Sequence, residues 1–185
     1  MKIIIIHGAY GNPDENWFPW LKTELERAGH KVFIPTFPTP EGQDLENWLK
    51  SFQEYKEYLD EDTILVGHSL GPALILTVLE RIDKPIKAAF FVAGFIGLLN
   101  NTEFDKINKT FVNKQFNWNK IRTNCKNFFT YASDNDPYVP LNKTDELSER
   151  LGIRTILVNK AGHFNAAAGY TKFQRLLDDV LRISR

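Results

Sequence analysis

The chain has 185 residues, of which 43% are hydrophobic and 25% charged, a composition ordinary for a soluble globular protein with one sizeable core. Its 23 basic and 23 acidic residues cancel, so the charge balance favours neither a nucleic-acid partner nor binding to an anionic membrane surface. No composition break divides the sequence. We therefore expect one domain over residues 1–185.

The apolar stretches are too short to export the chain or to hold it in a membrane. The run Ile3–Ile6 is shorter than the core of a signal peptide. The uncharged run at residues 88–99 is below membrane-spanning length and contains two glycines. Cys125 has no second cysteine to pair with and is expected to be a buried thiol. These features predict a cytoplasmic protein.

Strand-like and helix-like segments alternate along the chain, which predicts an α/β protein with a mainly parallel sheet. The predicted strands cover residues 2–6, 31–34, 62–66, 87–93, 128–132 and 154–158. The predicted helices cover residues 15–28, 45–59, 73–81, 140–152 and 167–182. Between residues 94 and 126 the pattern loosens into an asparagine-rich segment with scattered aromatic residues, as in a lid or a surface segment.

The stretch Leu65–Ala73 contains the sequence Gly67-His68-Ser69-Leu70-Gly71. A buried strand precedes it and a helix follows, which is the context in which Gly-x-Ser-x-Gly forms a nucleophile elbow. Small residues at Gly67 and Gly71 permit the sharp turn that such a serine requires. The pattern alone also fits a glycine-flanked turn with an idle serine, so partners for Ser69 decide its role.

A serine hydroxyl needs a base to take its proton, and that base needs a carboxylate to orient it. The loop after the fifth predicted strand offers two acids, Asp134 and Asp136, at the edge of the sheet where ligands bind in α/β proteins. His163 follows the sixth predicted strand. Residue order and position therefore predict Ser69 as nucleophile, His163 as base and one of the two aspartates as the acid.

Backbone amides are expected to stabilise the negative charge that develops on the substrate oxygen. One amide normally comes from the residue after the nucleophile, and a second comes from the loop after an earlier strand. Leu70 and Ala9 are the candidates for this oxyanion hole, with Tyr10 as an alternative to Ala9. Metal-ligand spacings and dinucleotide fingerprints are missing from the sequence, so no cofactor is predicted.

Several blocks of the sequence resemble the small serine-hydrolase family that includes retinoblastoma-binding protein 9 and its bacterial relatives. The blocks run in the family's order over nearly the whole chain: His7-Gly8, Trp17-Phe18-Pro19-Trp20-Leu21, Leu45-Glu46-Asn47-Trp48, Gly67–Gly71, the loop Ser133–Pro140 and Gly162-His163-Phe164. The resemblance implies a three-layer α/β-hydrolase fold with sheet order 2-1-3-4-5-6 and no large cap domain. It also implies a triad of Ser69, Asp136 and His163, and so favours Asp136 over Asp134.

The sequence thus predicts a serine hydrolase that cleaves small ester, thioester or amide substrates through an acyl-enzyme intermediate. The alternative is a non-catalytic interaction module that keeps the same fold, although Ser69, Asp136 and His163 are all present. No protein partner can be named from the sequence. An apolar acyl pocket is one role for Phe95, and core packing is the other.

Overall fold

The computed structural model describes residues Met1–Arg185 and contains a six-stranded sheet in the order β2-β1-β3-β4-β5-β6. All neighbouring strands pair in parallel. The strands are β1 (Lys2–Ile6), β2 (Lys31–Phe33), β3 (Thr63–His68), β4 (Ala88–Val92), β5 (Phe128–Ser133) and β6 (Ile156–Val158). The predicted sheet and its strand order are confirmed.

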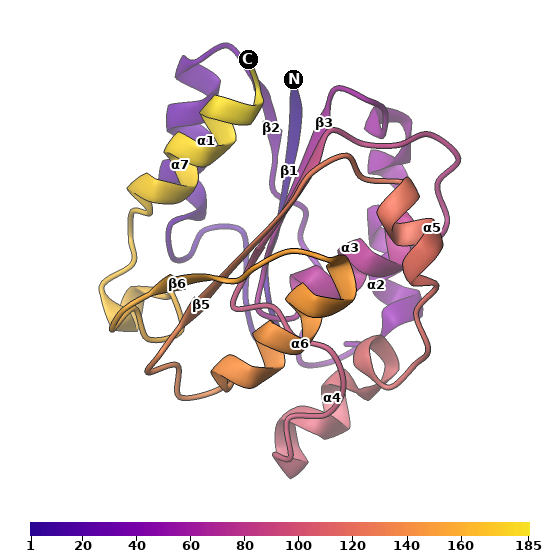
Figure 1. Cartoon of the computed structure of the whole chain (residues 1–185), viewed down its shortest axis with the longest axis vertical. Helices are drawn as coiled ribbons and strands as arrows, with labels where there is room; N and C mark the ends of the chain where they lie inside the picture. The colour runs from indigo at the N-terminus through magenta and orange to yellow at the C-terminus, as the bar shows by residue number, and fades with distance from the viewer.

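Helices cover both faces of the sheet, as predicted (Figure 1). The α-helices are α1 (Phe18–Arg27), α2 (Leu45–Phe52), α3 (Gly71–Leu79), α4 (Thr102–Val112), α5 (Trp118–Thr123), α6 (Leu141–Leu151) and α7 (Gln174–Ile183), and the 3-10 helices are η1 (Gln53–Tyr58) and η2 (Ala166–Ala168). None of them combines the length and the apolar composition that crossing a bilayer demands.

Two apolar clusters fill the space on either side of the sheet. Helices α1 and α7 pack on one face, where Trp17, Phe18 and Phe173 belong to a cluster of 20 buried residues. Helices α2 to α6 contribute to the other cluster, which has 26 buried residues. Residues of the central strands alternate between the clusters, with Ile3 and Ile5 in the first and Ile4 and Ile6 in the second, because successive strand side chains point to opposite faces.

Helix α1 begins at Phe18, not at the predicted residue 15. Pro19 occupies the first helical turn, where a missing N–H costs nothing. Asn16 adopts a positive φ of 55°, which no α-helical residue has, so Glu15 and Asn16 lie in a turn before the helix. Helix α7 likewise begins at Gln174 instead of residue 167, after Gly169 at φ 85° ends the short helix η2.

The asparagine-rich segment 94–126 contains two helices that the sequence pattern does not predict. Two of its asparagines are N-caps: Asn101 accepts hydrogen bonds from the amides of Glu103 and Phe104, and Asn117 accepts one from Lys120. Asparagine is a favoured N-cap because its side-chain oxygen satisfies amides that have no partner in the first turn. Helix α4 lies at the end of the molecule, at the bottom of Figure 1.

Candidate active site

Ser69 occupies the sharp turn between β3 and α3. Its φ is 57°, in the left-handed region that costs a non-glycine residue on the order of 1–3 kcal/mol. The flanking glycines allow this turn to pack closely: a Cβ on Gly67 would lie 2.7 Å from the Pro72 nitrogen, and one on Gly71 would lie 2.6 Å from the Ile6 oxygen. The geometry of a nucleophile elbow is therefore present.

His163 and Asp136 form a hydrogen-bonded pair in the loops after β6 and β5. The Nδ1–H of His163 donates to Oδ2 of Asp136 over 2.8 Å, and the two side chains are 10% and 2% exposed. The other carboxylate oxygen of Asp136 accepts the amides of Tyr138 at 2.9 Å and Val139 at 3.0 Å. These amides hold the carboxylate in one orientation, which leaves Nε2 of His163 as the ring nitrogen available to a reacting group.

The loop that carries Asp136 binds the loop that carries His163 through consecutive side chains. Four side chains of the first loop each accept a hydrogen bond from the second: Ser133 Oγ from the Ala161 amide (2.9 Å), Asp134 Oδ1 from the Lys160 amide (2.7 Å), Asn135 Oδ1 from the Gly162 amide (2.8 Å) and Asp136 Oδ2 from His163 Nδ1. We call these contacts the loop ladder. Asp134 is a ladder contact to backbone, whereas Asp136 meets the imidazole.

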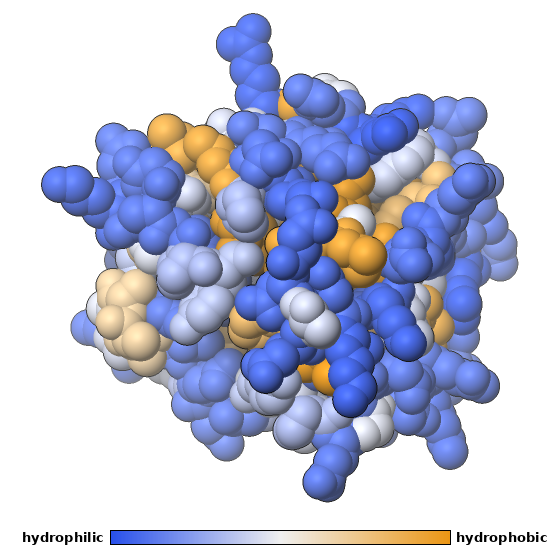
Figure 2. Space-filling model, turned by 90° about the horizontal axis from the view of Figure 1, so that it is seen from below, coloured by the Kyte–Doolittle hydropathy of each residue, from blue (hydrophilic) through white to orange (hydrophobic).

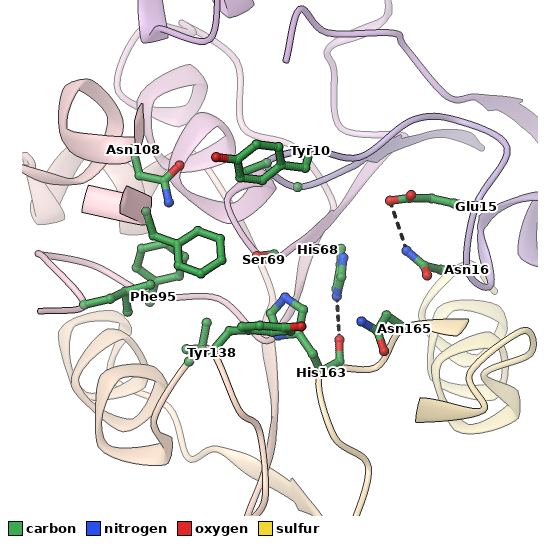
Figure 3. Close-up of a pocket in the computed structure, with 15 residues that line it drawn as sticks. Tyr10, Glu15, Asn16, His68, Ser69, Phe95, Asn108, Tyr138, His163 and Asn165 are labelled. Carbon is green, nitrogen blue, oxygen red and sulfur yellow. Dashed lines mark hydrogen bonds between the residues drawn. The ribbon is translucent and has the colours of Figure 1, made fainter. Parts of the chain in front are cut away.

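His68, immediately before Ser69, lies against the base loop. Its Nε2–H donates to the carbonyl oxygen of His163 over 2.8 Å, and its ring centroid lies 4.8 Å from that of His163 (Figure 3). Burial lowers the pKa of His68 to about 3, with a further lowering from the neighbouring His163. His68 is therefore a neutral donor that fixes the backbone of the base loop, and its side chain is directed toward the site.

The loop after β1 presents Ala9 beside Ser69. The amide of Tyr10 donates to Thr39 Oγ1 over 2.7 Å, so Tyr10 is already engaged. Neither Ala9 nor Leu70 donates its backbone N–H to another group of the protein. His7 holds this loop in place, because its Nε2 accepts the amide of Phe37 and its Nδ1–H donates to the Gly8 carbonyl. Burial lowers the pKa of His7, consistent with a neutral ring.

Ser69 and His163 line a cavity of about 250 Å³. Phe95 lies at one end of the cavity, with Asn108 near it, and Glu15, Asn16 and Asn165 lie at the other end (Figure 3). We call the Phe95 end the apolar end and the other the polar end. The lining residues are Gly8, Ala9, Tyr10, Glu15, Asn16, His68, Ser69, Phe95, Leu99, Phe104, Asn108, Tyr138, Val139, His163 and Asn165. Of the two roles considered for Phe95, wall of a pocket and filler of the core, the side chain combines both, being 1% exposed.

Aromatic side chains from three segments meet above this cavity. Phe104 of α4 makes edge contacts with Tyr10 and Tyr138, with ring centroids 6.2 and 5.8 Å apart, and Tyr138 lies 5.0 Å from the ring of His163. Asn108 of α4 is held by the side-chain amide of Gln43 over 2.8 Å. Viewed from the α4 end, the molecule shows hydrophobic atoms in separate areas within a mainly hydrophilic surface (Figure 2).

Trp17, Phe18 and Cys125 belong to the buried core and do not line the cavity. Trp17 and Phe18 are fully buried in the core, and Nε1 of Trp17 donates to the carbonyl of Phe164 over 3.0 Å. The Cys125 thiol is buried, and burial raises its pKa to about 12. No group of three or more His, Cys, Asp or Glu side chains is arranged to hold a metal ion.

The sequence interpretation missed Glu15, Asn16, Tyr138 and Asn165 as residues of the cavity. Glu15 and Asn16 fall inside a predicted helix, although Pro19 is a signal that the helix begins later. Asn165 and Tyr138 lie two residues from His163 and Asp136, so proximity to the candidate triad is the signal that would have found them.

A parallel sheet in this order, with a strained serine elbow after β3 and an acid–histidine pair after β5 and β6, defines an α/β hydrolase. Comparison with known proteins gives the same class. The sequence model of the serine hydrolase family matches residues 3–181, and the chain belongs to this family.

Relatives of this family cover nearly the whole chain. YdeN of Bacillus subtilis (strain 168) is 31% identical over 179 residues, 96% of this chain and 93% of its own. The serine hydrolase RBBP9 of Rattus norvegicus is 26% identical over 95% of this chain and 91% of its own. The crystal structure of the ydeN gene product superposes with a TM-score of 0.92 at 30% identity, covering 98% of this chain and 97% of that one.

An α/β-hydrolase from a Paenibacillus species has the same fold at lower similarity. It superposes with a TM-score of 0.69 at 18% identity, over 100% of this chain and 99% of that one. The predicted α/β-hydrolase fold without a large cap domain is confirmed by these structures together with the topology.

Proposed function

We propose that this serine hydrolase cleaves small esters, thioesters or amides with an apolar acyl group, using Ser69, His163 and Asp136 as its triad. The observation that carries the proposal is the hydrogen bond of 2.8 Å between His163 and Asp136 at the cavity that Ser69 also lines. Acyl transfer requires an oriented imidazole within reach of a serine hydroxyl, and Ser69, which is half-buried, lines the same cavity as His163.

In the proposed reaction, Ser69 Oγ attacks the substrate carbonyl while His163 Nε2 takes the hydroxyl proton. His163 then gives that proton to the leaving group as the carbonyl–leaving-group bond breaks, and Ser69 keeps the acyl group as an ester. Water, deprotonated by His163, attacks this ester and releases the acid. Asp136 stabilises the imidazolium that forms in each half of the cycle.

The amides of Ala9 and Leu70 are proposed to bind the oxyanion of the tetrahedral intermediates. Support comes from their lack of any other acceptor and from Tyr10, whose amide is taken up by Thr39. Free amides aimed at a developing negative charge lower the barrier because they need no reorganisation during the reaction. Leu70 is also the N-cap of α3, so the helix dipole adds to the effect.

The apolar end of the cavity supports the choice of acyl group. Phe95 and Leu99 offer hydrocarbon surface to a short acyl chain, and removal of such a chain from water is favourable by about 0.8 kcal/mol per methylene. A cavity of about 250 Å³ suits a small substrate better than a polymer. A cytoplasmic location, expected from the sequence, completes the proposal.

Labelling with a fluorophosphonate probe tests the proposal, since the probe modifies only an activated serine. We expect stoichiometric labelling of the parent and none of Ser69→Ala, whereas Ser51→Ala in α2 should be labelled like the parent. Equal labelling of Ser69→Ala and the parent would disprove the assignment. An unlabelled parent that turns over no ester would instead favour the non-catalytic interaction module.

A further inference from the structure

The end of the cavity opposite Phe95 is built from polar side chains. Glu15, Asn16 and Asn165 line it, and Ser69 lies between this end and the apolar end (Figure 3). The cavity thus has two chemically different ends on either side of the nucleophile. The proposed function uses only the apolar one.

Glu15 is set firmly at this polar end. Asn16 Nδ2 donates to Glu15 Oε1 over 3.1 Å, and the oxygen of the same Asn16 side chain accepts the Ala166 amide over 2.8 Å. The Glu15 carboxylate packs against Gly11, which lies in the loop after β1. A Cβ on Gly11 would lie 2.7 Å from Glu15 Oε1, so the carboxylate fills the space beside this glycine. Glu15 lies in the turn before α1, which includes Asn16 at a positive φ, and it lines the cavity.

The carboxylate of Glu15 has no cationic partner in the protein. Neither Lys, Arg nor His forms a salt bridge with it, and its side-chain contacts are the neutral amides of Asn16 and Asn12. Burial raises the pKa of Glu15, and hydrogen bonds from the Asn12 backbone and the Asn16 side chain lower it by less. A cation bound beside it would supply the missing compensation.

The polar end is where the leaving group of the substrate belongs. In the proposed reaction His163 hands a proton to the leaving group, so that group lies on the side of Ser69 that His163 flanks. Asn165 follows His163 in the same loop and lines the polar end together with Glu15. The acyl chain then occupies the apolar end.

We propose that Glu15 is a specificity-determining residue that binds a positively charged ammonium group on the leaving group of the substrate. This inference rests on the proposed function and deepens it, because it assigns the substrate class as esters or amides of amino-substituted alcohols, phenols or amines with an apolar acyl part.

Three butyrate esters that differ only at the para position of the leaving phenol test the inference: 4-(aminomethyl)phenyl, 4-(hydroxymethyl)phenyl and 4-methylphenyl. The kcat/KM of each is measured from phenol release at pH 7 for the parent, Glu15→Gln and the matched control Asp14→Asn. Asp14 is an exposed neighbour that does not line the cavity. The preference of each protein is its ratio of kcat/KM for the aminomethyl and methyl esters.

We expect Glu15→Gln to lower this preference about tenfold or more relative to the parent, the scale of a charged hydrogen bond, and Asp14→Asn to leave it unchanged. Comparing proteins cancels the intrinsic reactivity of the esters, and a ratio does not depend on the active fraction of a partly unfolded variant. The hydroxymethyl ester should lose less than the aminomethyl ester in Glu15→Gln, because it carries no charge.

An unchanged preference in Glu15→Gln would overturn the inference, as would an equal loss for the hydroxymethyl and aminomethyl esters. If Ser69→Ala loses the parent's hydrolysis of 4-methylphenyl butyrate but Glu15→Gln keeps the parent's preference, only this inference fails. If Ser69→Ala hydrolyses all three esters like the parent, the proposed function itself fails.

Discussion

His68 donates a hydrogen bond from its buried imidazole to the backbone carbonyl of His163, so the residue before the candidate nucleophile holds the loop of the candidate base. The bond requires a proton on Nε2, because a carbonyl oxygen only accepts, and burial, which lowers the pKa of His68 to about 3, keeps the ring neutral at pH 7. Protonating the ring would place a positive charge in a buried site with little solvent. Acid therefore destabilises the fold at His68.

The first prediction concerns stability against pH. The folded-state pKa of His68, about 3, is below the ordinary 6.5, so between these values only the unfolded chain binds the proton. The contribution of neutral His68 to the free energy of unfolding is fully present above pH 6.5. It is lost at about 1.4 kcal/mol per pH unit as the pH falls toward 3. Urea unfolding of the parent and of His68→Gln between pH 7 and 4 should show a smaller loss of stability on acidification in the variant. Parallel curves would contradict the prediction.

The second prediction separates the two aspartates. Asp136→Asn should lower kcat by about three to four orders of magnitude, because an amide in place of the carboxylate favours the wrong tautomer of the base. Asp134→Ala should keep kcat within a few-fold, while losing about 1 kcal/mol of stability with its hydrogen bond to the Lys160 amide. Ester kinetics and urea unfolding of both variants measure the two effects. A larger loss of kcat in Asp134→Ala would reverse the assignment.

The third prediction concerns Gly8, which packs against the serine elbow. A Cβ on Gly8 would lie 2.7 Å from the Cβ of Ser69 and 3.2 Å from the His68 oxygen, so Gly8→Ala must displace the serine. We expect kcat/KM to fall by about 100-fold, the cost of a displacement on the order of 1 Å. Gly29→Ala is the control: it strains a residue at φ 86° with nothing within 4 Å, and should lower stability and leave kcat/KM alone.

The fourth prediction concerns the thiol. Burial raises the pKa of Cys125 to about 12, and only the thiolate is nucleophilic, so iodoacetamide at pH 8 should not alkylate the folded protein. The same reagent in a urea concentration that unfolds the protein should modify Cys125 fully. Mass spectrometry reads out both reactions. Rapid alkylation without urea would show that the thiol is accessible.

Regular elements were predicted from the sequence more successfully than their ends and their contacts. The run Lys2–Ile6 is a strand at the predicted residues because β-branched side chains are buried on both faces. Helix α2 begins at the predicted residue 45, where the Asp44 carboxylate accepts the Asn47 amide as an N-cap. Helices α4 and α5 were missed, because their asparagine caps read as loop residues in the sequence.

The candidate site follows the same division. Ser69 and His163 line one cavity and Asp136 is hydrogen-bonded to His163, because parallel topology brings the loops at the carboxyl ends of their strands together. Choosing between Asp134 and Asp136 from residues alone was not possible, since both lie in one loop and only their backbone conformations separate them. Glu15 was missed for a similar reason, because the helix predicted from residue 15 begins only at Phe18 and Glu15 lies in the turn before it.

The loop ladder has a consequence for engineering this scaffold. Its four hydrogen bonds join residues 26 to 28 positions apart in the sequence. Inserting or deleting one residue in either loop would therefore shift the donors relative to the acceptors in all four. Loop grafting at this edge should therefore exchange the two segments as a matched set. Turns at the amino ends of the strands, such as the one at Gly29 between α1 and β2, are safer places for changes in loop length.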